Sequence, residues 1–229
     1  MGQFVDLVSG DGFTVPAWVA EPDAAPRGAV VVLQEIFGVN VHIRAVADRF
    51  AARGYLAVAP ATFARVQPGV DLGYGPQDMA TGLALKAAAE ALPGAGVMPD
   101  IQAAIDHAAR VSGRKVGIVG FCWGGLLAWR AACTLQGLSA AVPYYGGGMT
   151  SADETARQPQ VPVLAHFGQR DHWIPLDSVQ AFARAHPEVE VHIYDADHGF
   201  NCDQRGSYDE AAAMAARDRT LAFFDRHLV

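Results

Sequence analysis

Short apolar runs alternate with longer segments of helical periodicity along almost the whole chain, and this alternation limits the possible folds more than any other feature. Residues 29–35, AVVVLQE, are rich in β-branched side chains and apolar at even and odd positions alike, which is typical of a strand covered on both faces. Residues 41–53 then have apolar side chains at helical spacing and stop at Gly54. The pattern predicts an α/β fold with a mostly parallel central sheet and helices on both faces.

The same reading applied to the rest of the chain gives a full set of elements. Expected strands cover residues 3–9, 13–21, 29–35, 55–59, 115–120, 140–145, 161–167 and 189–194. Expected helices cover residues 41–53, 79–92, 101–111, 125–134, 178–185 and 208–227. The Gly- and Pro-rich segment 60–76 is a candidate lid or pocket loop. A chain of 229 residues is long enough for one such domain and short for two, so we expect a single domain, 1–229.

Charge and hydropathy exclude several classes of partner. The formal charge of −7 arises from 17 basic and 24 acidic residues without a basic block, which argues against a nucleic-acid partner. Apolar runs such as 29–33 are far shorter than the roughly 18 to 20 residues of a membrane span. Residues 1–6 resemble no secretion signal, and the three cysteines lack the spacing of a disulfide framework. We therefore expect a cytoplasmic protein with no membrane partner.

The segment 116–125, VGIVGFCWGG, places Cys122 between glycines where a predicted strand gives way to a predicted helix. Each glycine costs backbone entropy, so the turn must need them. A G-x-nucleophile-x-G turn between strand and helix is the nucleophile elbow of α/β hydrolases. The helix N-terminus favours a thiolate over a thiol at this position. Cys122 is the candidate nucleophile, and the alternative is a buried cysteine that fills the core.

A cysteine nucleophile needs a base and a group that orients the base. Asp171 follows the predicted strand 161–167, and His198 follows the predicted strand 189–194. Ligand sites in open α/β sheets form at the carboxyl ends of strands, and the order nucleophile, acid, histidine is that of an α/β hydrolase. We expect His198 as base and Asp171 as its orienting group. His172 is the alternative base, but it adjoins Asp171 in one loop and would rarely point at it.

Glu35 ends an apolar strand, where a charge is costly unless it is solvated or paired. It can reach solvent, or it can lie beside Cys122. In the second arrangement the backbone N–H groups of Ile36 and Trp123 would form an oxyanion hole, since α/β hydrolases build theirs from these two places.

Together these segments resemble the dienelactone hydrolase family over nearly the whole chain. The residues that carry the resemblance are QEIFG at 34–38, GFCWGG at 120–125, PYYG at 143–146, 168–175 with Asp171, and HGF at 198–200. It implies Cys122 as nucleophile, His198 as base, Asp171 as orienting group and Glu35 as the carboxylate that engages the cysteine. It also implies that the resting cysteine is a thiol until substrate moves the glutamate. The implied reaction opens a dienelactone to maleylacetate, in the breakdown of chlorinated aromatics, without a cofactor.

The chain departs from this family where the substrate carboxylate is bound. The family pattern has two arginines, one after the long loop and one four residues beyond the catalytic histidine. Here residues 77–82 contain no arginine, and position 202 is cysteine. Arg205 and Arg65 are the possible replacements, although either can be an ordinary surface residue. Further candidates for substrate contact are Phe37, Tyr144 and Tyr145, the two tyrosines being equally compatible with core packing.

Three hypotheses follow from the sequence. The first is a hydrolase of lactones or small esters, with dienelactone the leading substrate. The second is a general carboxylesterase or thioesterase on the same scaffold, favoured by the missing arginines. The third is a ligand binder or redox sensor without catalysis, in which Cys122 reacts with oxidants. Cys202 and His198 are only a pair of ligand types, so we expect no metal site. The expected partner is a small-molecule lactone or ester, bound by a monomer or small homo-oligomer.

Overall fold

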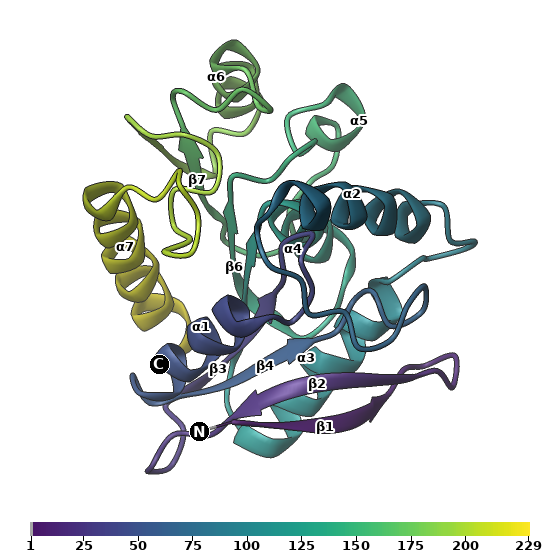
Figure 1. Ribbon diagram of the computed structural model, residues 1–229. Helices are drawn as coiled ribbons and strands as arrows, with labels where there is room; N and C mark the ends of the chain where they lie inside the picture. The colour runs from purple at the N-terminus through teal and green to yellow at the C-terminus, as the bar shows by residue number, and fades with distance from the viewer. Residues whose placement is uncertain (1) are drawn as a thin grey trace.

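A computed structural model describes residues 2–229, so Met1, the first residue of the expected domain 1–229, lies outside the described part. Within it, eight strands form one sheet in the order β1-β2-β4-β3-β5-β6-β7-β8 (Figure 1). The strands are β1 (Gln3–Val8), β2 (Thr14–Ala20), β3 (Gly28–Leu33), β4 (Tyr55–Pro60), β5 (Val116–Phe121), β6 (Leu138–Tyr144), β7 (Leu164–Gly168) and β8 (Glu190–Tyr194). The helices are α1 (Val41–Ala51), α2 (Pro76–Glu90), α3 (Met98–Ser112), α4 (Trp123–Thr134), α5 (Ala152–Thr155), α6 (Leu176–Ala185) and α7 (Glu210–Leu228).

The sheet is mostly parallel, as the sequence predicts. Strands β4, β3, β5, β6, β7 and β8 pair in parallel, and the β1–β2 hairpin adds to β4 in antiparallel orientation. Every residue of β3, β4 and β5 is buried, which explains why these runs are apolar at both even and odd positions. The predicted α/β-hydrolase fold is confirmed.

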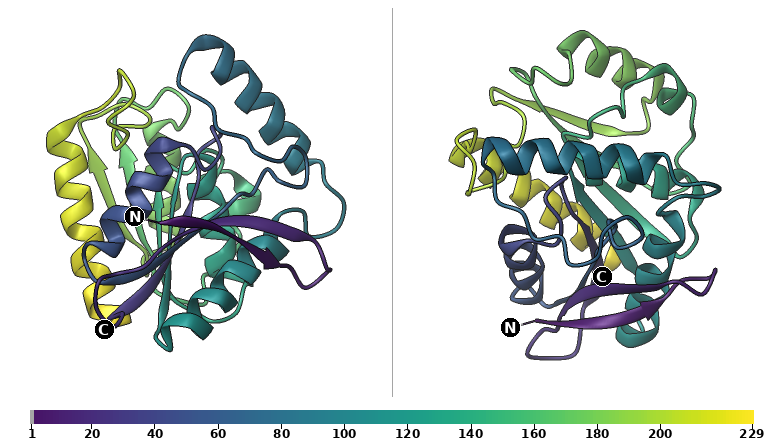
Figure 2. Two further views of the ribbon diagram at one scale, coloured as in Figure 1. Left: turned by 60° about the horizontal axis from the view of Figure 1, so that its bottom comes forward. Right: turned by 45° about the vertical axis from the view of Figure 1, so that its right-hand side comes forward.

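Helices cover both faces of the sheet (Figures 1 and 2). Helices α1 and α7 share one face, where the rings of Phe50 and Phe224 lie 6.0 Å apart. Helices α3 and α4 pack on the other face. Helix α2 instead crosses the molecule above the loop that follows β3, and a Cβ at Gly82 would lie 2.4 Å from the carbonyl oxygen of Ile36. This close packing fixes α2 over the carboxyl end of the sheet.

Several element boundaries differ from the predicted ones: α3 begins at Met98 rather than at residue 101, and β7 begins at Leu164 rather than at residue 161. Helix α2 begins at Pro76 rather than near residue 79, because proline suits the first helical position and the Asp78 carboxylate accepts a hydrogen bond from the Gly75 N–H. The four-residue helix α5 was not predicted, since so short an element leaves no periodicity in the sequence. Residues 61–75 have no helix or strand, as expected of the long loop. None of the helices within residues 2–229 is long and apolar enough to cross a membrane.

Candidate active site

The parallel strands end at one edge of the sheet, and the residues singled out in the sequence follow those ends. Glu35 follows β3, Cys122 follows β5, Tyr145 follows β6, Asp171 follows β7 and His198 follows β8. Cys122 and His198 line one pocket of about 200 Å³ at this edge. The topology therefore brings together residues that are up to 163 positions apart, from Glu35 to His198.

The elbow has the strained geometry that its glycines indicate. Cys122 has φ 55° and ψ −117°, a conformation that is costly for a residue with a side chain. A Cβ at Gly124 would lie 2.4 Å from the carbonyl oxygen of Gln34, and one at Gly125 would lie 2.5 Å from that of Tyr144. The turn thus fits between the ends of the neighbouring strands only with glycine at these positions.

Two backbone amides in this region are the candidates for an oxyanion hole. Within residues 2–229, the N–H groups of Ile36 and Trp123 donate no hydrogen bond to another residue, whereas the Cys122 N–H donates to the Tyr144 carbonyl at 3.1 Å. Trp123 lies at the start of α4, where the first N–H groups of a helix have no partner within the helix. Ile36 lines the pocket. These are the two positions that the sequence suggests for an oxyanion hole.

Asp171 holds His198 directly. The Asp171 Oδ2 atom lies 2.7 Å from His198 Nδ1, and both side chains are buried. The Asp171 Oδ1 atom accepts hydrogen bonds from the backbone N–H groups of Trp173 (2.8 Å) and Ile174 (3.2 Å). Asp171 therefore both closes its own loop and orients the histidine. The bond at Nδ1 leaves Nε2 of His198 for Cys122.

The environment of His198 favours its protonated form. Burial opposes protonation, but the charge of a Cys122 thiolate and the hydrogen bonds to Asp171 and Cys122 outweigh it and raise the pKa of His198. The ring of Tyr145 meets that of His198 edge to face at 5.1 Å. Tyr145 itself has φ 36° and is fully buried. This arrangement fixes the orientation of the imidazole.

Glu35 is buried and paired with a cation. Its Oε1 atom accepts a hydrogen bond from Arg205 at 3.1 Å, and its Oε2 atom accepts one from the Tyr74 hydroxyl at 3.3 Å. Among the described residues, no hydrogen bond joins Glu35 to Cys122. The carboxylate thus lies in the site through Arg205, which lines the pocket, rather than by direct contact with the cysteine.

The pocket wall is mostly apolar and includes residues that the sequence analysis did not select. Phe37 and Arg205 line it as expected. Three residues of α2 at helical spacing form one side of the wall, and residues of loops form the remainder. The residues not anticipated are Met79, Leu83, Lys86, Gly147, Gly148 and Trp173. The spacing of Met79, Leu83 and Lys86 was visible in the sequence, but nothing there showed which way that face points.

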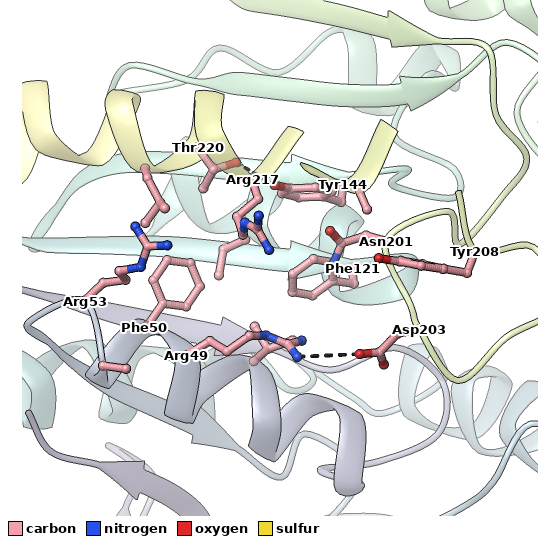
Figure 3. Close-up of a pocket in the computed structure, with 15 residues that line it drawn as sticks. Arg49, Phe50, Arg53, Phe121, Tyr144, Asn201, Asp203, Tyr208, Arg217 and Thr220 are labelled. Atoms are coloured by element: carbon pink, nitrogen blue, oxygen red, sulfur yellow. Dashed lines mark hydrogen bonds and ion pairs between the residues drawn. The ribbon is translucent and has the colours of Figure 1, made fainter. Parts of the chain in front are cut away.

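Tyr144 lies elsewhere. Its hydroxyl is 2.6 Å from the Thr220 hydroxyl, and it borders a second cavity of about 220 Å³ between α1 and α7. Figure 3 shows this cavity, which is lined by three arginines and several aromatic side chains: Arg49, Arg53, Arg217, Phe50, Phe121 and Tyr144. Cys122 and His198 are not among its lining residues within the described chain, so the interpretation of Tyr144 as a wall of the catalytic pocket is corrected.

The remaining alternatives from the sequence are resolved by position. Arg65 forms ion pairs with Asp100 and Asp11, both at 2.8 Å, and does not line the Cys122 pocket as described. Its role is structural, joining the β1–β2 turn to α3. His172 is exposed, while His198 holds Asp171. His198 is therefore the histidine placed to act with Cys122.

Comparisons with known proteins agree with this geometry. The sequence model of the dienelactone hydrolase family matches residues 15–228. The carboxymethylenebutenolidase of Pseudomonas putida is 35% identical over 225 residues, covering 96% of this chain and 94% of that protein. A crystal structure from Klebsiella pneumoniae, whose name assigns it provisionally to the dienelactone hydrolases, is 33% identical with a TM-score of 0.84 and covers 99% of each chain. A dienelactone hydrolase-like phosphotriesterase, P91, shares the fold at 23% identity, with a TM-score of 0.81 and coverage of 100% of this chain and 99% of that one.

Proposed function

Because the chain belongs to the dienelactone hydrolase family, we propose that it is a cysteine-dependent hydrolase that opens a lactone or small ester through an acyl-enzyme. The leading substrate is dienelactone, hydrolysed to maleylacetate. One observation carries the proposal: Cys122 sits in a strained elbow with His198 beside it, and His198 is held by Asp171 at 2.7 Å. This is the arrangement that nucleophilic catalysis by a thiol requires.

In the proposed reaction, the Cys122 thiolate attacks the carbonyl carbon of the substrate. The carbonyl oxygen becomes an oxyanion that accepts hydrogen bonds from the N–H groups of Ile36 and Trp123. Collapse of this intermediate breaks the ring C–O bond, and His198 gives its proton to the departing oxygen. Neutral His198 then takes a proton from water, which attacks the thioester, and Cys122 leaves as thiolate while His198 keeps the proton.

A substrate carboxylate would be bound by two cations on the pocket wall. Arg205 lies only 13% exposed above Phe37, with its guanidinium carbon 5.8 Å from the ring centroid. Lys86 approaches from α2. We propose that Arg205 and Lys86, both lining the pocket, replace the two arginines of the family pattern from other positions in the chain. An anionic lactone is favoured by this pair of charges.

A general carboxylesterase or thioesterase remains the second candidate, and the pocket wall favours it. Phe37, Met79, Leu83 and Trp173 offer apolar surface to an acyl or alkyl chain without a charge. Leu83 and Trp173 are largely exposed, which leaves the mouth open to a longer substrate. This candidate uses the same Cys122, His198 and Asp171, and differs only in substrate.

Steady-state kinetics on dienelactone and matched uncharged esters test the proposal. Wild-type protein should show the higher kcat/KM on dienelactone, and Cys122→Ala should lose at least about a hundredfold in rate on every substrate, as expected for a nucleophile. Circular dichroism of Cys122→Ala serves as the control for folding. A variant that keeps more than about a hundredth of the rate would identify another nucleophile. A preference for uncharged esters would support the second candidate.

A further inference from the structure

We propose that Glu35, His42 and Cys202 form a binding site for a divalent transition-metal ion of zinc-like preference. One ligand atom from each residue lies within 4.8 Å of the other two, and all three side chains are buried. The residues come from three separate segments: the loop after β3, helix α1, and the loop between β8 and α7. A carboxylate, an imidazole and a thiol are the ligand types that zinc takes in proteins.

His42 supplies the second observation. Its Nε2 atom is buried and has no hydrogen-bond partner within residues 2–229, although the side chain is only 1% exposed. Buried polar atoms are nearly always paired, so an orphan atom needs an explanation. Its other ring nitrogen, Nδ1, lies 3.3 Å from Asp203 Oδ1. A histidine that ligates a metal commonly has a carboxylate on its far nitrogen, as His42 has here.

The charges of the site balance those of the ion. When the metal binds, the Cys202 thiol releases its proton to solvent, and an S–metal bond replaces the S–H bond. Glu35 and the Cys202 thiolate then offset the two positive charges of the ion. Arg205 already holds Glu35 Oε1, and the Asp203 carboxylate lies behind His42. Asp203 also pairs with Arg49 at 3.6 Å, so the carboxylate behind His42 lies between the metal site and a second arginine.

The present contacts of Glu35 leave room for this step. Arg205 uses Oε1, and the Oε2 atom accepts only a 3.3 Å hydrogen bond from Tyr74. Zinc bonds of about 2.0 to 2.3 Å place tetrahedral ligand atoms roughly 3.5 Å apart, so ligands within 4.8 Å must close by little more than an ångström. Three protein ligands leave the fourth position to water.

The sequence suggested only a pair, Cys202 with His198, and no metal site was expected from it. The structure instead commits His198 to Asp171 and brings His42 to Cys202 from 160 residues away. Neither Cys122 nor His198 is a ligand, so metal binding can be measured apart from hydrolysis, although the two sites share Glu35 through Arg205.

Cobalt titration of the full-length protein, first dialysed against a chelator, tests the site. Co²⁺ takes zinc sites and reports on its ligands, because a thiolate ligand gives a near-ultraviolet charge-transfer band and tetrahedral geometry gives intense visible bands. We expect both bands to saturate at one ion per chain. Cys202→Ser should abolish the charge-transfer band. Cys122→Ser and Cys133→Ser, which replace the other two cysteines, should leave it unchanged.

Asp203→Asn adds a variant whose folding is not in question, because the Asp203 side chain is 45% exposed. It should weaken cobalt affinity by about 10 to 100-fold, as the loss of a carboxylate behind a ligating histidine does. The proposal is overturned if no band appears in wild-type protein, if the band survives in Cys202→Ser, or if it disappears in Cys122→Ser. Loss of hydrolysis in Cys122→Ser with cobalt binding intact would separate this site from the catalytic one.

Discussion

The proton of Cys122 depends on two neighbours with opposite effects. His198 stabilises a thiolate by ion pairing, and the same interaction raises the pKa of the imidazole. The carboxylate of Glu35 would oppose a thiolate, but Arg205 and Tyr74 hold that carboxylate. Family resemblance implied a resting thiol that is activated by substrate. The structure adds that Glu35 is held by Arg205 and Tyr74 and makes no hydrogen bond to Cys122 within residues 2–229, so we take a resting thiolate paired with His198 as the competing hypothesis.

Alkylation with iodoacetamide at neutral pH distinguishes these two resting states. We expect Cys122 to react fastest of the three cysteines, because burial raises the pKa of Cys133 and of Cys202 to about 12. His198→Gln should slow labelling of Cys122 by about tenfold or more, since an ordinary thiol with a pKa of about 8.5 is only a few per cent thiolate at neutral pH. Peptide mass spectrometry identifies the labelled site. Slow labelling that a carboxylate ligand accelerates, with the acceleration lost in Glu35→Gln, would instead support the resting thiol.

Lys86 is the cation best suited to test carboxylate binding, because Arg205 also holds Glu35. Lys86→Ala should raise KM for dienelactone by about tenfold, because it removes a charged hydrogen bond at a half-exposed site. It should leave KM for an uncharged ester unchanged. Lys115 is exposed at the start of β5, at the opposite end of the sheet, so Lys115→Ala is the matched control. An equal change in KM for both substrates would remove Lys86 from the carboxylate site.

The sequence predicted the strands and the elbow. It also predicted which loops after the strands carry the candidate catalytic residues. This succeeded because the signals are local: β-branched runs mark buried strands, and the glycines mark the turn. Directions of side chains were harder. Tyr144 and Tyr145 are neighbours in sequence, yet Tyr144 borders the cavity between α1 and α7, whereas Tyr145 is fully buried with its ring against that of His198. The face of α2 and the partners of Arg205 depend on packing between distant segments, which no local pattern records.

The elbow glycines predict a specific loss of stability. Gly124→Ala should lower the free energy of unfolding by about 1 to 3 kcal/mol, the usual cost of overpacking, because its Cβ would meet the backbone oxygens of Gln34 and Leu33 at 2.4 and 2.6 Å. Gly10→Ala is the control, since nothing lies within 4 Å of a Cβ there, and it should change stability by less than about 0.5 kcal/mol. Urea unfolding measures both. Equal stability of the two variants would show that the elbow can relax.

At the scale of the whole molecule, His166 is a buried histidine that takes no part in the proposed reaction. His166 on β7 is fully buried, with Nδ1 2.9 Å from the Tyr194 hydroxyl and Nε2 3.0 Å from the Thr220 hydroxyl. Burial, reinforced by the charges of His192 and Arg219, lowers the pKa of His166 well below its ordinary value of 6.5. The folded protein therefore binds fewer protons at His166 than the unfolded chain does in mild acid.

This difference sets the direction of a pH effect on stability. Well above pH 6.5 the His166 imidazole is neutral in the folded and unfolded states. As pH falls below that value, His166 becomes protonated in the unfolded chain but stays neutral in the folded protein. The free energy of unfolding should fall by up to about 1.4 kcal/mol per pH unit from this residue. His166→Gln should flatten the dependence, whereas His172→Gln, at an exposed histidine, should not. Urea unfolding between about pH 5 and pH 7 measures the slopes, and identical slopes in wild type and His166→Gln would contradict the assignment.

Helix α2 forms part of the pocket wall and carries none of the three residues proposed for catalysis. Cys122, His198 and Asp171 are carried by loops on the rigid sheet, whereas Met79, Leu83 and Lys86 belong to a helix entered and left through irregular chain. Its closest fixed point is Gly82 against the carbonyl of Ile36. The end of α2 is tied to α4 by Glu90, which accepts a hydrogen bond from Trp123 and pairs with Arg130. A chimera that keeps Gly82 and receives the outer residues of another α2 should acquire the donor's substrate range while retaining the recipient's catalytic residues.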